Sequence, residues 1–294
     1  MRVTSGMIYS MTTVNITSQY ERMFQVSEQV TSGKRINRPS DDPVDVAKAL
    51  DYRTLLGALE QYKKNVERGT NLLRYTESAL ETAGDVLRDA KTLAEQMATG
   101  SYSEDQRKVL AVQAEQLFRQ MLQVANTQIS GRYIFSGFKT DTQPFVADDD
   151  FNVTYQGDNN QIRFTVQQNS TVAVNITGQA AFLDATNVFA VLRDLRTALR
   201  ENDQAAIGSI LPRIDDAMNQ IQKVRAYVGT SLKELEATAS VLDDVKLNAE
   251  KLLSDTEDTD IADAVTKLAE RQMVYEASLK STAMITQLSL VHFV

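Results

Sequence analysis

Acidic side chains are the sequence's main candidates for chemistry. Asp41 and Asp42 could form a general acid and base pair, and the three aspartates at 148–150 could bind a cation. Asp42 directly precedes Pro43, a residue that suits the first position of a helix, so we interpret this pair as a helix cap. The aspartate run precedes a predicted strand, where an acidic loop is usually just solvated.

The other groups that could do chemistry are few. The sequence has no Cys and a single His, His292. A catalytic triad or a multi-histidine metal site therefore lacks its residues, and we interpret His292 as a surface residue at a helix end. Lys34, Arg35 and Arg38 could bind an anion, but three cations in one loop are typical of a solvated face. The glycine-rich phosphate and dinucleotide motifs are missing as well. The sequence thus predicts neither an enzyme nor a cofactor or metal site.

Composition limits the partners. The net charge of −8 argues against binding to nucleic acid. No apolar run approaches the ~18 residues of a membrane-spanning helix, and the first residues lack the apolar core of a signal peptide. Composition alone would favour a cytoplasmic protein. The 294 residues include only 4 Pro and 12 Gly, so long helices are expected.

The two ends of the chain are predicted amphipathic helices, one over residues 7–32 and one from residue 261 onward. In each, apolar residues recur at steps of three and four, which places them on one helix face. Polar residues such as Thr13 and Ser27 interrupt this face, so each helix needs a partner. From the pattern alone, a core within one chain and an interface between chains are equally open. The residues we expect at an interface between subunits are Tyr9, Ile16, Tyr20, Met23, Val30, Ile261, Val265, Leu268, Tyr275, Leu279 and Leu288.

Between the ends lie longer helical segments. One begins at Pro43 and carries a regular apolar seam from Leu59 to Met97, in which Gly69 and Ala83 would allow close approach. Ser103 with Gln106 predicts a capping box for the next helix, whose face runs from Leu110 to Gln128. Further helices are expected from Asn187 and over about 204–253, with Pro212 marking a late start or a kink. The polar stretch 254–260 predicts a break.

The period changes to two from Arg132 to about Phe182, which predicts a small antiparallel β unit. We therefore expect a mainly α fold with a small β insertion, in which the terminal helices pair as a coiled coil and the other helices form a bundle. The predicted domains are an inner domain of residues 1–40 with 255–294, a helical bundle of 41–131 with 184–254, and a β domain of 132–183.

Residues 30–43 resemble a signature of the bacterial flagellin family, in which a loop links the terminal helix to the first long helix. The loop positions that carry this signature are Gly33, Arg35, Asn37, Pro39, Asp41, Asp42 and Pro43. Residues 71–80 look like the continuation of that signature. The stretches 131–145, 275–280 and 287–290 are similar to a narrower group of the family, the hook-associated proteins.

The resemblance implies a structural protein of the flagellum at the junction of hook and filament. It implies export through the flagellar type III apparatus rather than a cytoplasmic location. It also implies several partners: neighbouring copies in a ring, the other junction protein, flagellin, and an export chaperone on the C-terminal helix. The alternatives are a short flagellin that builds the filament itself and, from another class, a coiled-coil signalling rod. An enzyme that uses the acidic clusters has no supporting site.

Overall fold

The computed structural model describes residues 5–99 and 102–291, although side chains at positions 5 and 8 and from 285 onward are not described. The chain divides into two compact units, residues 1–58 with 244–294 and residues 59–243, which are described separately below. The predicted division into three domains, with boundaries at 40/41, 131/132, 183/184 and 254/255, stays a prediction.

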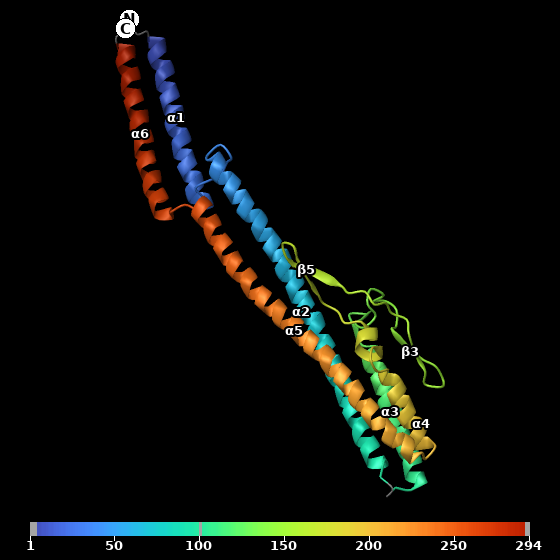
Figure 1. The fold of residues 1–294 in the computed structure, drawn as a ribbon. Coiled ribbons are helices and arrows are strands. Elements are labelled where there is room, and N and C mark those ends of the chain that lie inside the picture. The colour runs from blue at the N-terminus through green and yellow to red at the C-terminus, as the bar shows by residue number, and fades with distance from the viewer. Residues whose placement is uncertain (1–4, 100–101, 292–294) are drawn as a thin grey trace. The chain divides into compact units, whose positions relative to one another are not determined.

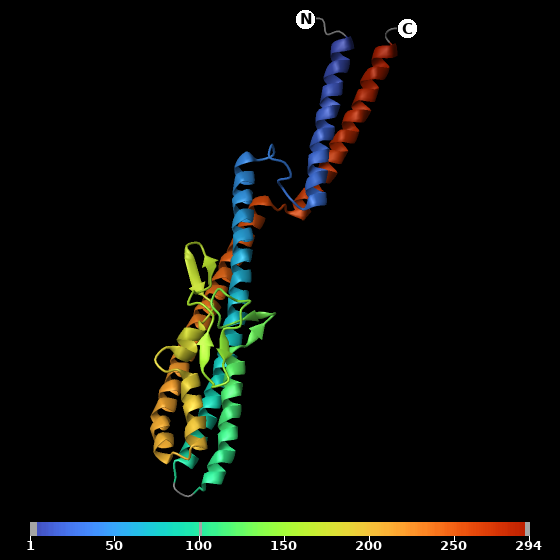
Figure 2. The same ribbon diagram turned by 90° about the vertical axis from the view of Figure 1, so that its right-hand side faces the viewer.

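The first unit contains a pair of terminal helices. These are α1 (Ser5–Ser32) and α6 (Ile261–Val291), which lie side by side (Figures 1 and 2). The beginning of α2 (Pro43–Met97) and the end of α5 (Gln204–Glu257) complete the unit. Helix α1 begins two residues before its predicted range of 7–32 and ends where predicted, and α6 begins at the predicted residue 261. Because α5 continues to Glu257, the predicted break at 254–260 is too long by one helical turn.

The second unit is a helical bundle. Its members are the rest of α2 and α5 together with α3 (Glu104–Ala125) and α4 (Val188–Arg200). Helices α2 and α5 run antiparallel, because Lys63, Glu77 and Lys91 of α2 form ion pairs with Asp243, Arg225 and Asp215 of α5, in that order. The predicted seam of α2 is buried from Leu59 to Met97, apart from the half-buried Tyr62, so this prediction is confirmed.

The side chains predicted to cap the helices α3 and α2 do so in the structure. Ser103 and Gln106 form the predicted capping box of α3. Asp42 caps α2, since its Oδ1 accepts hydrogen bonds from the backbone amides of Val44 and Asp45, both at 3.1 Å. Pro212 lies inside α5, which excludes the late helix start, and the alternative of a kink stays a prediction. The placement of Gln128 on the face of α3 is wrong, because α3 has already ended at Ala125 and Gln128 belongs to a strand.

The β segment consists, in the described residues, of three separate two-stranded hairpins rather than one sheet. It begins at residue 128, four residues before the predicted start. The hairpins are β1 (Gln128–Ile129) with β2 (Arg132–Tyr133), β3 (Phe145–Ala147) with β4 (Val153–Tyr155), and β5 (Arg163–Gln167) with β6 (Ser170–Ala173). A short π-helical segment, η1 (Gln179–Leu183), leads back to α4.

A cluster of phenylalanines joins the hairpins to the bundle. Phe145 of β3 lies 5.5 Å from Phe182 and 5.0 Å from Phe189 of α4, between ring centroids. Phe118 of α3 and Phe135 extend the cluster, and all five rings are almost fully buried. Such rings dominate the energetics of a core, so the hairpins and the bundle share one apolar interior.

Candidate assembly site at the paired chain ends

The facing sides of α1 and α6 are only partly apolar and only partly covered. Among the predicted interface residues, Ile16, Met23, Val30, Leu268 and Tyr275 are half-buried. The rings of Tyr20 and Tyr275 lie 5.9 Å apart and join the two helices. The two helices thus meet in this pair, and the role of these residues in an interface between subunits stays a prediction.

The other predicted interface residues keep much of their surface. Tyr9 is 68% exposed, and Tyr20, Ile261, Val265 and Leu279 are between 41% and 49% exposed. Leu288 lies on α6 where side chains are not described, and His292 lies outside the described residues. An exposed apolar side chain is ordinary by itself, but a row of them along one helix pair is the usual mark of a contact surface.

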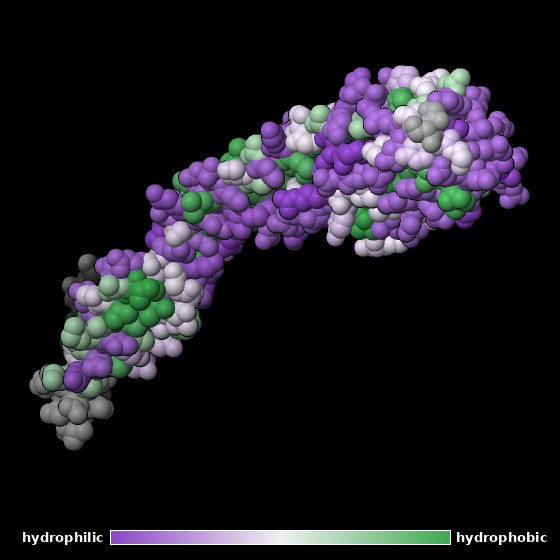
Figure 3. All heavy atoms as spheres, turned by 90° about the horizontal axis from the view of Figure 1, so that it is seen from below, coloured by the Kyte–Doolittle hydropathy of each residue, from purple (hydrophilic) through white to green (hydrophobic). Residues whose placement is uncertain are grey.

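A groove of about 1110 Å³ runs between α1 and α6 near the chain ends. Its walls are mostly apolar and include Met7, Met11 and Ile16 on one side and Val274 and Ala277 on the other. Figure 3 shows apolar residues gathered on this helix pair. Met side chains adapt to surfaces of different shape, so this lining suits a helix laid in the groove.

The signature loop connects α1 to α2 and is held by ion pairs. The Arg35 guanidinium lies 2.6 Å from Asp45, and Arg38 lies 3.1 Å from Glu28. The hydrogen bond from Arg35, followed by that from Lys48, lowers the pKa of Asp45 below its usual value. Lys34, Arg35 and Arg38 keep 39%, 44% and 56% of their side-chain surface, as expected for a solvated face, and each also has a carboxylate partner.

The remaining signature residues shape the loop. Gly33 adopts a φ of +71°, which a residue with a Cβ rarely tolerates, and it ends α1. The Asp41 carboxylate accepts hydrogen bonds from the backbone amides of Asn37 and Arg38. Pro39 is exposed, and Pro43 occupies the first position of α2. Asp41 and Asp42 therefore have structural partners, as expected for a cap.

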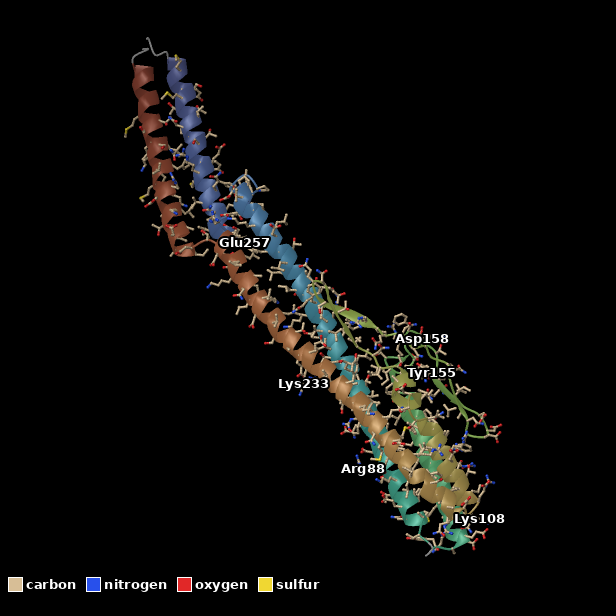
Figure 4. The ribbon with its side chains drawn as sticks, in the orientation of Figure 1. Arg88, Lys108, Tyr155, Asp158, Lys233 and Glu257 are labelled. Carbon is tan, nitrogen blue, oxygen red and sulfur yellow. The ribbon has the colours of Figure 1, made fainter. Side chains whose placement is uncertain are left out.

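Sequence reasoning missed two buried residues beside this loop. Ile36 is buried in the loop itself, and Glu257 is buried at the end of α5, labelled in Figure 4. Ile36 is an apolar residue in an otherwise polar loop, which was a usable signal. Glu257 lies among Asp, Ser and Thr residues in the sequence, and nothing in that pattern indicated that it would be buried.

The acidic side chains do not gather into a metal site in the described part of the chain. Within it, no three His, Asp or Glu side chains are grouped so that they could hold a metal ion. The aspartate run is used internally, because Asp148 accepts hydrogen bonds from the backbone amides of Asp150 and Asn152. None of the helices, as far as they are described, is apolar over a length that would span a bilayer.

Comparisons with known proteins agree with this architecture. The bacterial flagellin N-terminal helical region matches residues 3–140, and the bacterial flagellin C-terminal helical region matches residues 211–294. The flagellar hook-associated protein 3 of Escherichia coli (strain K12) is 28% identical, over 99% of this chain and 98% of the relative. The protein of the same name from Salmonella typhimurium is 26% identical, over 96% of each chain.

Solved structures show the same fold. The flagellar junction protein FlgL from Legionella pneumophila superposes with a TM-score of 0.62 at 20% identity, over 72% of this chain and 100% of that one. FlgL of Bacillus cereus gives a TM-score of 0.61 at 24% identity, over 69% of this chain and 99% of that one. More than a quarter of this chain thus has no counterpart in either solved chain. With both flagellin regions matched and a fold like that of FlgL, the chain belongs to the bacterial flagellin family and is a homologue of the flagellar hook-associated proteins.

Proposed function

We propose that this chain is a structural junction protein of the bacterial flagellum, which joins the hook side to the flagellin filament. The observation that carries the proposal is the partly uncovered helix pair α1/α6, in a chain whose relatives over nearly its full length are hook-associated proteins. A junction needs surfaces that bind other subunits rather than a reaction centre, and an exposed row of apolar side chains supplies such a surface.

The terminal helices would order fully only on assembly. Burial of apolar surface contributes ~25 cal/mol per Å², and this gain has to exceed the entropy lost when helix and side chains become fixed. In one isolated chain, α1 and α6 cover only one side of each other. Neighbouring subunits would cover Tyr9, Val265 and Leu279 as well, so the gain would exceed the entropy lost only in the polymer.

The partners follow from this role. Copies of the chain would form a ring, with the other junction protein on the hook side and flagellin on the filament side. Stacking of this kind needs head-to-tail contacts between unlike surfaces. The C-terminal helix would also bind an export chaperone, in whose groove an amphipathic helix fits. The chain would leave the cell through the flagellar export apparatus and reside in the extracellular flagellum.

A double variant tests the proposal. Ile16→Asp with Leu268→Asp places two carboxylates in the facing sides of α1 and α6, where burial of a charge is costly. In cells that lack the native gene, we expect wild-type protein to restore filaments on hooks. We expect the double variant to be exported but to leave flagellin unpolymerised in the medium, as electron microscopy and blotting of the medium would show.

The matched control replaces two exposed apolar residues of α3, Val109→Asp with Val112→Asp, and should retain filament attachment. Thermal unfolding of the purified monomers should be near wild type for both variants. Equal loss of monomer stability and attachment in the first variant would contradict an interface that forms late.

The alternative function is that of a flagellin that forms the filament itself, and one measurement tests it. A flagellar filament core protein of Treponema maltophilum is 28% identical over 87% of this chain, so a filament-forming role has a specific relative behind it. Growth of long filaments from the purified chain alone would favour that role over the junction.

A further inference from the structure

The bases of the two terminal helices are tied together by backbone hydrogen bonds. The amide of Arg35 donates to the carbonyl oxygen of Glu257 over 2.7 Å, and the amide of Thr259 donates to the carbonyl oxygen of Gly33 over 3.0 Å. Lys34 and Asp258 form an isolated antiparallel bridge at the same place. The chain just after α1 therefore pairs with the chain just before α6, although more than 200 residues separate them.

A buried carboxylate lies at the centre of this pairing. Glu257 is only 6% exposed, yet both of its oxygens are used. Oε1 lies 2.8 Å from Nζ of Lys34, and Oε2 accepts a hydrogen bond from Nη2 of Arg53 on α2. A carboxylate removed from water needs such partners, and the loss of its charge leaves two cations facing each other. Glu257 therefore joins three segments: the signature loop, α2 and the end of α5.

On α1, burial decreases from this point toward the chain end, and on α6 the most buried of the described side chains lies near the base. Near the base, Ala264 is 1% exposed, and Val26 and Val30 are half-buried. Toward the ends, Met11 is 70% exposed and Met284 is 65% exposed. Ile261 and Val265 beside Ala264 keep 47% and 48% of their surface, so the closer packing near Glu257 comes from Ala264 and from the last turns of α1.

We propose that Glu257 is a latch that fixes the bases of α1 and α6 in register, so that the two helices order from their bases toward their ends. With the bases tied, closing the helix pair no longer requires two distant segments to find each other, and each further turn adds contacts to an existing pair. The proposal deepens the assembly role proposed above, because it says where the ordering of the ends begins and which residue controls it.

Hydrogen exchange measured by mass spectrometry on the full-length monomer tests the latch. In the wild-type chain, we expect the base segments 26–32 and 261–268 to exchange at least 10-fold more slowly than segments 9–16 and 277–284. The variant Glu257→Gln keeps the shape of the side chain but removes its charge. It should speed exchange at both bases by at least 10-fold while segment 73–97 of the bundle is unchanged.

Glu250→Gln is the matched control, because it makes the same substitution two turns earlier on α5 at an exposed residue. It should leave every segment as in the wild type. Faster exchange over 73–97 in Glu257→Gln would mean that this variant also destabilises the bundle. The variant Lys34→Met then separates the two effects, because Lys34 is a partly exposed partner of Glu257. Faster exchange at both bases in Lys34→Met, with 73–97 still protected, would support the latch, and unchanged exchange at the bases would overturn it.

Unchanged exchange at the bases in Glu257→Gln would overturn the latch, as would uniform exchange along α1 and α6 in the wild type. Neither result would test the junction role, because that role is measured by filament attachment in cells. Conversely, a normal latch in a protein that does not attach filaments would overturn the junction role alone.

Discussion

Arg107 is a charged residue in the core of the bundle, and every part of its guanidinium has a partner. Nη1 donates to Oδ1 of Asn202 over 2.6 Å, and Nη2 donates to the carbonyl oxygen of Thr99 over 3.1 Å. Nε faces the carbonyl oxygen of Met97, the last residue of α2, at 3.4 Å. The partial negative charge at the C-terminus of a helix favours a cation there, which accounts for a buried arginine without a carboxylate.

Arg107→Met should lower the free energy of unfolding by about 2–3 kcal/mol, because it leaves Asn202 and two carbonyl groups without their donor. Arg88→Met makes the same change at an exposed residue of α2 (Figure 4), where an ion pair with Asp85 contributes ~0.5 kcal/mol or less. Urea unfolding of both variants measures the difference. Equal small losses would mean that water replaces the donor at Met97 and Thr99.

Helix α2 shows how closely the elements of the bundle pack. Gly69 lies in its seam, and a Cβ at this position would stand 2.8 Å from Cγ1 of Val174 and 3.3 Å from Cδ1 of Leu235. The close approach expected at Gly69 is therefore present. At Gly69, α2 lies close both to α5 and to the segment that follows β6.

Two glycines of α2 give opposite predictions. Gly84→Ala should stabilise the protein by about 0.5–1 kcal/mol, because Ala favours helix and nothing lies within 4 Å of its Cβ. Gly69→Ala should instead be about 1–3 kcal/mol less stable than Gly84→Ala, because Val174 and Leu235 have to shift. Thermal and urea unfolding measure both. Adding Val174→Ala should recover part of the loss, and a Gly69→Ala variant as stable as Gly84→Ala would refute the crowding.

The long helices could be predicted because a repeated seam and good caps carry redundant information over many turns. The seam from Leu59 to Met97 and the Ser103 cap are examples. The β segment was harder, because its short strands are set by tertiary contacts, such as those of Phe145 with α4, rather than by their own period. The latch at Glu257 was invisible in the sequence, since its partners Lys34 and Arg53 lie more than 200 residues away.

At the scale of the whole molecule, the proposed junction role requires that one part of the chain stays folded while its ends open. Trypsin can compare the two parts at sites that are all exposed. Arg22 and Arg271 lie on α1 and α6, whereas Arg88 and Lys233 lie in the bundle unit (Figure 4 labels the latter two). An exposed site in a helix is cut only when the helix opens locally, so the cleavage rates report opening rather than accessibility.

In the monomer, we expect cleavage after Arg22 and Arg271 to be at least 10-fold faster than after Arg88 and Lys233, as a timed digest followed by mass spectrometry would measure. Helices α1 and α6 have few buried apolar residues, whereas α2 and α5 pack in a continuous core, so the terminal helices should open locally more often. In isolated hook–filament complexes, neighbouring subunits should cover both terminal helices, and cleavage at Arg22 and Arg271 should slow to the rate of the bundle sites. Equal rates at all four sites in the monomer would mean that the ends are already as stable as the bundle, and assembly would then have to use preformed helices.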